Sequence, residues 1–162
     1  MSEPWDDWEV VREPGLTREE MAERAKRSTE DFIAAIEAMP ADALARPGAV
    51  GIWSGHDVVA HCVVWHDYVV EVVRRSLDGT FRVEDFEYPD EDEYNERTAA
   101  ELAPLPTSEL LGRLRSAAQA VGELLERLPE EEWRARDRYE VVVTGELVDH
   151  LNEHMEDLRK LG

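Results

Sequence analysis

Cysteine is nearly absent from this chain, and its scarcity is the first constraint on class and location. Cys62 is the single cysteine among 162 residues, so no disulfide can form within the chain. This excludes the small secreted scaffolds that depend on disulfides, and it favours a reducing compartment, so we expect a cytoplasmic protein. A chain near 150 residues can bury roughly 68–70% of its unfolded surface. We therefore expect a single domain over residues 1–162, with an N-terminal arm over 1–16.

Positive charge and long apolar runs are also scarce. The chain has 18 basic and 38 acidic side chains, which gives a net charge of −20. Nucleic acids and anionic membrane surfaces bind clustered cations, so we expect neither as a partner. A membrane span needs about 18 uncharged apolar residues, and the most apolar stretch, 58–73, is interrupted by two histidines and two acids. The glycine-rich phosphate loop and the GxSxG nucleophile motif are missing as well.

Four segments repeat apolar residues with the 3.6-residue period of an amphipathic helix: 17–39, 54–77, 107–128, and 144 or 145 to 161. Thr17 with Glu20, and Ser54 with Asp57, have the spacing of capping boxes. Four amphipathic helices predict an all-α four-helix bundle with at most a short strand. The long connection between 77 and 107 can cross over between two parallel neighbours. Its acidic part, 84–93, is typical of a solvated loop, and part of 90–101 can form an extra helical turn or two.

The five histidines divide into two groups by their position on the helices. His61, His150 and His154 lie within the apolar stripes, and His150 and His154 are one turn apart on one face. His56 and His66 are each five residues from His61. At about 100° per residue they point about 140° away from it, so we expect them to face solvent or a loop.

Two explanations fit the three histidines in the stripes. Each can be a core residue bonded to a backbone carbonyl, and an HxxxH pair occurs in many helices by chance. Alternatively, all three ligate one ion, since imidazoles at i and i+4 can reach a metal with Zn–N bonds of about 2.0–2.1 Å. Unpaired buried imidazoles are costly, and a shared metal in the bundle core would satisfy all three at once.

The segments around these histidines resemble the DinB-like superfamily. WSGHDVVAH at 53–61 is similar to the start of its second helix, and HLNEH at 150–154 is similar to the HxxxH of its fourth. The resemblance spans 17–161 in helix order. It implies a bundle in up-down-down-up order with a long crossover between helices 2 and 3. It also implies a homodimer and a divalent metal, zinc or nickel, on His61, His150 and His154. Related branches include mycothiol-dependent maleylpyruvate isomerases and bacillithiol transferases.

Three neutral imidazoles would leave a metal with an open position, which is the pattern of catalytic sites. Such an ion can activate a water or a thiolate. Asp57 and Glu146 are candidates to orient the imidazoles, although each also fits the first-turn charge of a helix. Cys62 points about 100° from His61 and is expected to be a core residue.

Three functions stay open on the sequence alone. One is a metal-dependent transferase or hydrolase that acts on a small-molecule electrophile, with or without a low-molecular-weight thiol. The second is a non-catalytic metal- or ligand-binding protein. The third is a structural dimer with an idle site. The catalytic residues, the substrate and the identity of the metal are not readable from the sequence.

Overall fold

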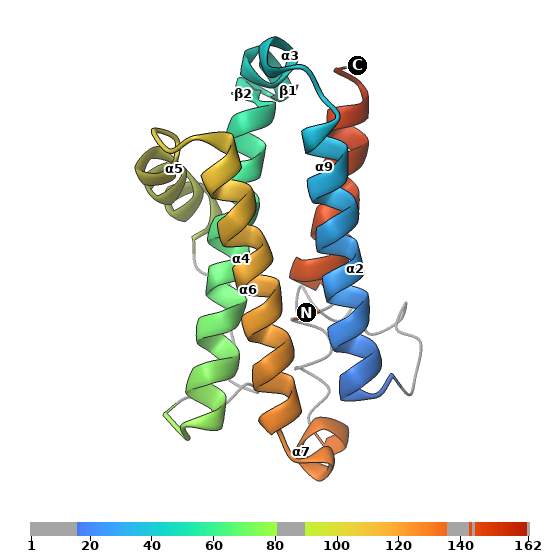
Figure 1. Cartoon of the computed structure of the whole chain (residues 1–162). Helices are drawn as coiled ribbons and strands as arrows, with labels where there is room; N and C mark the ends of the chain where they lie inside the picture. The colour runs from blue at the N-terminus through green and yellow to red at the C-terminus, as the bar shows by residue number, and fades with distance from the viewer. Residues whose placement is uncertain (1–15, 81–89, 136–142, 144, 162) are drawn as a thin grey trace, which may run out of the picture.

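Helices dominate the structure, a computed structural model that describes residues 16–80, 90–135, 143 and 145–161 (Figure 1). The all-α class predicted from the four apolar stripes is confirmed. The helical segments are α2 (Arg18–Glu37), α3 (Ala41–Ala45), α4 (Gly55–Leu77), α5 (Glu91–Leu102), α6 (Thr107–Arg127), α7 (Glu130–Ala135), the π-helical turn η2 (Gly145–Asp149) and α9 (His150–Arg159). The expected N-terminal arm lies almost entirely outside the described residues.

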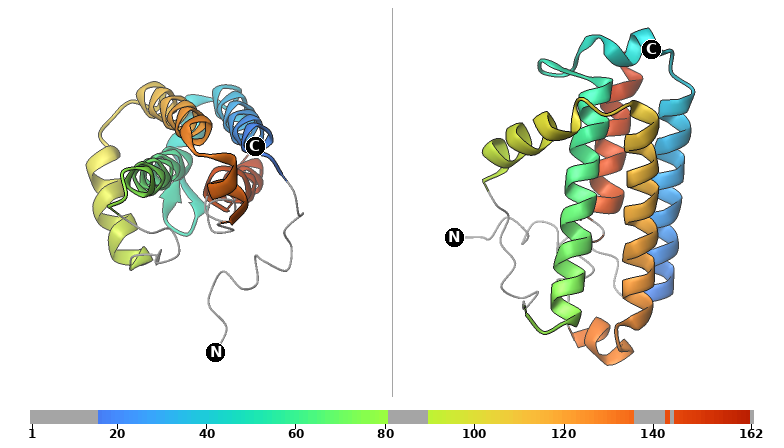
Figure 2. Two further views of the ribbon diagram at one scale, coloured as in Figure 1. Left: turned by 90° about the horizontal axis from the view of Figure 1, so that it is seen from below. Right: turned by 60° about the vertical axis from the view of Figure 1, so that its left-hand side comes forward.

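The long helices α2, α4 and α6 stand side by side with α9 (Figure 2). In Figure 1, α2 and α9 run toward the end of the bundle that carries α3, whereas α4 and α6 both run away from it. The helices α4 and α6 are therefore parallel neighbours, and the connection between them crosses the length of the bundle. This connection holds α5, which packs against α4 on the outside of the bundle (Figure 2).

Both predicted capping boxes are present. The Thr17 hydroxyl accepts from the backbone N–H of Glu20, and Ser54 accepts from the N–H of Asp57. The carboxylates of Glu20 and Asp57 accept the backbone N–H of Thr17 and Ser54 in return. These contacts explain why α2 and α4 begin within one residue of the predicted starts.

The smaller elements were predicted only in part. The loop between α2 and α4 contains α3 and an antiparallel hairpin of β1 (Pro47–Val50) and β2 (Trp53–Ser54). The helix α5 has twelve residues, longer than the expected turn or two, and three acids occupy its first turn, where they favour the helix dipole. A π-helical turn over Gly145–Asp149 leads into α9, and Val143 before it is also helical. Thr144, the alternative predicted start, lies outside the described residues.

Two clusters of buried apolar side chains form the core, and α4 contributes to both. One cluster contains its residues Val58, Val59, Ala60, Cys62 and Val63, and the other contains Val69, Val70, Val72 and Val73. The segment between them carries Trp65 and His66, both buried. No helix among the described residues is both long enough and apolar enough to cross a membrane.

Candidate metal centre

Three imidazoles from two distant parts of the chain meet inside the bundle. His61 lies in the second turn of α4, and His150 and His154 lie on α9. His150 Nε2 is 2.7 Å from His61 Nε2 and 2.9 Å from His154 Nε2. One nitrogen from each of the three rings falls within 4.8 Å of the other two. This group can therefore hold a metal ion.

The two short contacts at His150 Nε2 cannot both be hydrogen bonds. A ring nitrogen either carries one proton and donates once, or carries one lone pair in the ring plane and accepts once. One of the two N···N contacts is therefore unsatisfied without a further group. Zn–N bonds of about 2.0–2.1 Å in a tetrahedral site separate two ligating nitrogens by about 3.3 Å. The two N···N distances at His150, 2.7 and 2.9 Å, are somewhat shorter than this separation. A small outward shift of the rings would therefore admit a small divalent cation.

Burial keeps His61 and His150 neutral, which is the form that ligates metals. His61 is 4% exposed and His154 is 7% exposed. Burial, together with the neighbouring His154, lowers the pKa of His61 from 6.5 to about 3. Burial and the three nearby histidines lower the pKa of His150 to about 2. Lone pairs of His61 and His150 are thus available near pH 7 without competition from protons.

Carboxylates stand behind two of the three rings. Glu146 Oε2 is 3.5 Å from His150 Nδ1, and Asp157 Oδ2 is 3.2 Å from His154 Nδ1. Such acids fix which nitrogen carries the proton and make the other a better ligand. Glu146 was one of the two candidates from the sequence. The other, Asp57, is instead committed to the capping box with Ser54. Asp157 was missed, although its spacing of three from His154 on one helix face was a readable signal.

The other two histidines stand apart from this group. His56 lies against the connection before α6, as expected: its Nδ1 is 2.7 Å from Thr107 Oγ1 and its Nε2 is 2.9 Å from the carbonyl oxygen of Ala103. The prediction that His66 faces solvent or a loop was wrong. His66 is fully buried, and its Nε2 lies 3.4 Å from the hydroxyl of Thr29 on α2. The angular argument failed because α4 is covered on nearly every side.

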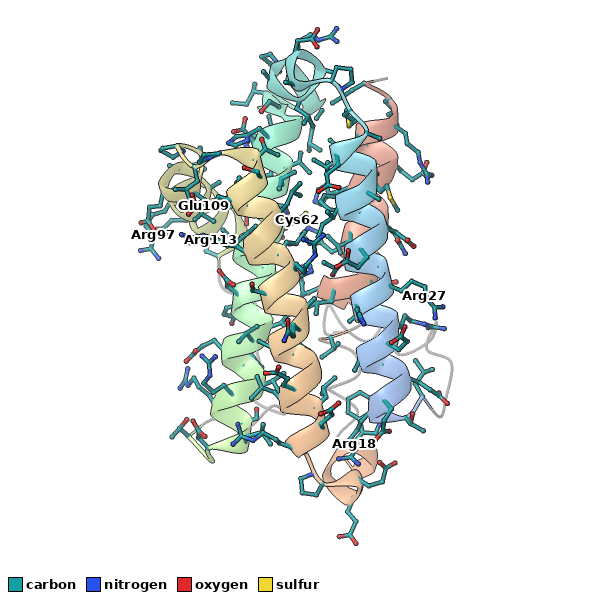
Figure 3. All side chains as sticks on the ribbon, in the orientation of Figure 1. Arg18, Arg27, Cys62, Arg97, Glu109 and Arg113 are labelled. Atoms are coloured by element: carbon teal, nitrogen blue, oxygen red, sulfur yellow. The ribbon has the colours of Figure 1, made fainter. Side chains whose placement is uncertain are left out.

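Two tryptophan rings lie beside His61, and the neighbouring Cys62 belongs to the apolar core. The ring centroid of His61 lies 5.0 Å from that of Trp53 and 6.4 Å from that of Trp65. Cys62, labelled in the interior of the bundle in Figure 3, is fully buried, as predicted. Burial and the nearby Glu146 raise the pKa of its thiol, so it is a poor nucleophile and a core residue.

A family model decides the relationship to known proteins. Residues 25–148 match the mycothiol maleylpyruvate isomerase N-terminal domain family. The chain belongs to this family. The matched range contains His61 and Glu146 but ends just before His150 and His154, so those two histidines are assigned by their geometry. The DinB-like resemblance is confirmed by this match and by the helical fold. No curated protein matches the chain.

Two solved structures share the fold of this mycothiol maleylpyruvate isomerase N-terminal family member. A Streptococcus pneumoniae protein superposes with a TM-score of 0.77 at 15% identity, covering 94% of this chain and 93% of that one. The colibactin self-resistance protein ClbS, solved in complex with dsDNA, superposes with a TM-score of 0.75 at 16% identity, covering 92% and 97%. A protein of this fold can thus be DNA-bound, so the fold does not support the expectation of no nucleic-acid partner. That expectation rests on the charge of this chain alone.

Proposed function

We propose that His61, His150 and His154 bind one divalent metal ion, with zinc or nickel as the favoured metals. The observation that carries this proposal is the position of His150 Nε2, within 3 Å of two other imidazole nitrogens when it can hydrogen-bond to only one. The neutral state of the buried His61 and His150 rings supports it further. So do the two carboxylates, because they supply negative charge close to the proposed cation.

We propose that the metal serves an enzymatic reaction on a small-molecule electrophile, of the transferase or hydrolase type. Three protein nitrogens leave a coordination position open, and there the ion would lower the pKa of a bound water or thiol. The family description names mycothiol, a thiol, which supports a low-molecular-weight thiol as the second reactant. The side chains of this chain hold the ion, orient its ligands through Glu146 and Asp157, and exclude bulk water with Trp53 and Trp65.

A second function is a metal- or ligand-binding role without turnover. It is favoured by one observation: the buried groups next to the histidines leave no evident general base among the described residues. Glu146 and Asp157 both face Nδ1 atoms and are occupied there. The two functions separate in a screen of the metal-loaded protein with thiols and small electrophiles. Turnover that needs both the metal and His150 supports the enzyme, and metal binding without turnover supports the binding protein.

We further propose that the chain forms one domain and works in the cytoplasm as a homodimer without nucleic acid. The net charge of −20 supports the last point, because it repels a phosphate backbone. Light scattering at micromolar concentration tests the dimer. Titration of labelled duplex DNA at low salt tests the absence of nucleic-acid binding. This test is needed because ClbS, which shares the fold, was solved in complex with dsDNA.

The experiment that tests the metal proposal is elemental analysis of the purified protein, followed by titration of the metal-free protein with Zn²⁺ and Ni²⁺. We expect one ion per chain. His150→Ala should reduce the metal affinity by about 10–100-fold or more. Removing a group that only hydrogen-bonds to a metal ligand already costs this much, so removing a ligand should cost at least as much. His56→Ala is the control, because His56 makes its contacts with Thr107 and Ala103, and it should leave the affinity unchanged. Equal affinity of wild type and His150→Ala would refute the proposal.

A further inference from the structure

The indole N–H of Trp53 differs from those of the other two tryptophan side chains that the structure describes. Trp65 donates its indole N–H to Asn95 Oδ1 over 2.8 Å, and Trp133 donates to the carbonyl oxygen of Leu16 over 2.8 Å. The indole N–H of Trp53 makes no hydrogen bond with any residue that the structure describes. An indole nitrogen can donate but cannot accept. Trp53 therefore offers a donor to an acceptor from outside the chain.

Trp53 also keeps part of its surface exposed. Trp65 is 2% exposed and Trp133 is 5% exposed, whereas Trp53 is only partly buried and packs against the edge of an apolar core cluster. Its backbone is fixed on both sides, because Trp53 pairs with Val50 in the hairpin and the next residue, Ser54, caps α4. The side chain thus starts from an ordered backbone and can still be reached by a small molecule.

The Trp53 ring borders the proposed metal centre. Its centroid lies 5.0 Å from that of His61, and the two planes are tilted by 50°. An ion bound to His61 Nε2 would lie about 3 Å from the centroid of the imidazole, and hence within about 8 Å of the Trp53 centroid in any direction. A ligand of a few atoms in the open coordination position can span this distance. Trp65 also borders His61, but it is buried and its N–H is already bonded.

We propose that Trp53 is the substrate-contacting residue of the centre, and that its indole N–H donates to an oxygen of the small molecule that occupies the open metal position. This inference rests on the metal site proposed above and narrows the class of substrate. A group that only donates selects a ligand with an acceptor atom. Carbonyl and carboxylate oxygens are such acceptors, and a carboxylate makes the stronger, charge-assisted bond. The substrate class is therefore a small carbonyl or carboxylate compound.

The same donor distinguishes between the two reactants of the proposed reaction. Sulfur is a weak hydrogen-bond acceptor, so a thiol gains little from the indole N–H. The electrophile, through its oxygen, gains the full bond. Trp53 is thus assigned to the electrophile and not to the thiol.

Two variants of the full chain test this assignment. Trp53→Phe keeps an aromatic ring beside His61 but removes the N–H. The matched control, Trp133→Phe, removes an indole N–H on α7, which lies at the end of the bundle opposite β2 (Figure 1). Each protein is loaded with Zn²⁺ and titrated with benzoate, a small carboxylate probe, in a calorimeter. The Zn²⁺ affinity is measured in the same way.

Trp53→Phe should bind benzoate at least about 10-fold more weakly than wild type, because a hydrogen bond to a charged group is lost. Trp133→Phe should bind benzoate as wild type does, and both variants should keep a Zn²⁺ affinity close to that of wild type. Equal benzoate affinities of wild type and Trp53→Phe, or no binding by either, would overturn the proposal. So would a loss of benzoate binding that only follows a loss of bound Zn²⁺.

A second readout observes the donor itself. In ¹H–¹⁵N spectra, the indole signal of Trp53 is assigned by its absence in Trp53→Phe. Benzoate should move this signal downfield in the Zn²⁺-loaded wild type and leave the Trp133 signal in place. An unmoved Trp53 signal would overturn the inference. If wild type bound no Zn²⁺, the metal proposal would fail, and the role of Trp53 would stand only if benzoate still moved its signal in the metal-free protein.

Discussion

His61 and His150 are 89 residues apart in the chain, yet their Nε2 atoms lie 2.7 Å apart. Both rings are neutral near pH 7, because burial lowers both pKa values, so each can have an unprotonated Nε2. Two neutral nitrogens at this distance share either one proton or one cation. His154 Nε2 also approaches His150 Nε2. A shared proton explains only one of the two short contacts, whereas a cation bound to all three nitrogens explains both.

Glu146 and Asp157, which face imidazole rings, should affect Zn²⁺ affinity, whereas the capping residue Asp57 should affect only stability. Glu146→Gln and Asp157→Asn remove a charge that faces an imidazole Nδ1, so each should weaken Zn²⁺ binding by about 10–100-fold. Asp57→Ala is the matched control, because Asp57 only caps α4. It should lower the free energy of unfolding by about 1 kcal/mol and leave the Zn²⁺ affinity unchanged. Calorimetric titration and chemical denaturation measure the two quantities, and a metal defect in Asp57→Ala would contradict this division of roles.

The metal-free protein should take up protons when it unfolds in mild acid. Three buried histidines have folded pKa values of about 3, 4 and 2, against 6.5 when exposed: His61, His66 and His150. Between about pH 4 and 6.5 they are neutral when folded and become charged on unfolding. Their contribution to stability is therefore complete above pH 6.5 and declines as the pH falls toward the folded values.

His66 allows this to be measured for one group. Burial raises the pKa values of Asp67 and Asp149, which changes the pH dependence of stability in the opposite direction. The pH dependence of the wild-type stability alone therefore does not isolate the histidines. The contributions of Asp67 and Asp149 cancel when wild type is compared with His66→Leu. At pH 5, unfolding of His66→Leu should take up about one proton fewer than unfolding of wild type, from the pH dependence of denaturation midpoints. Equal uptake would show that His66 is already protonated in the fold.

A side chain at Gly55 should be costly, because α3, α4 and α9 approach one another there. A Cβ at this position would lie 2.9 Å from Leu44 Cδ2 and 3.3 Å from Leu158 Cδ2. Gly55→Ala should therefore cost about 1–3 kcal/mol of stability through overpacking. Gly112 on α6 is the matched control, because a Cβ added there would meet nothing within 4 Å. Gly112→Ala should be stabilising by up to about 1 kcal/mol. Thermal denaturation distinguishes the two, and a neutral Gly55→Ala would contradict the close approach.

The long helices could be predicted because their signals are local. Caps and periodic stripes lie within a few residues of one another, as Ser54 and Asp57 do, so α2, α4 and α6 begin close to where the sequence predicts. The convergence of His61 with His150 and His154 was also predictable, since an inward polar ring needs a partner. Metal ligation itself stays a prediction.

The features that were missed depend on tertiary contacts. The burial of His66 follows from how completely α4 is surrounded, which its own periodicity does not reveal. The burial of Asn95 on α5 gave no signal either, because an asparagine on an acidic, weakly apolar helix is ordinarily a surface residue. The π-helical turn at Gly145 and the short α3 likewise depend on how the ends of the bundle close.

X-ray absorption at the zinc edge of the Zn²⁺-loaded protein tests the central claim most directly. The account predicts three imidazole nitrogens at about 2.0–2.1 Å, with one or two further light ligands from solvent or a bound small molecule. It also predicts no sulfur at about 2.3 Å, because Cys62 is a buried core thiol. A sulfur ligand, or a shell with one imidazole or none, would contradict it.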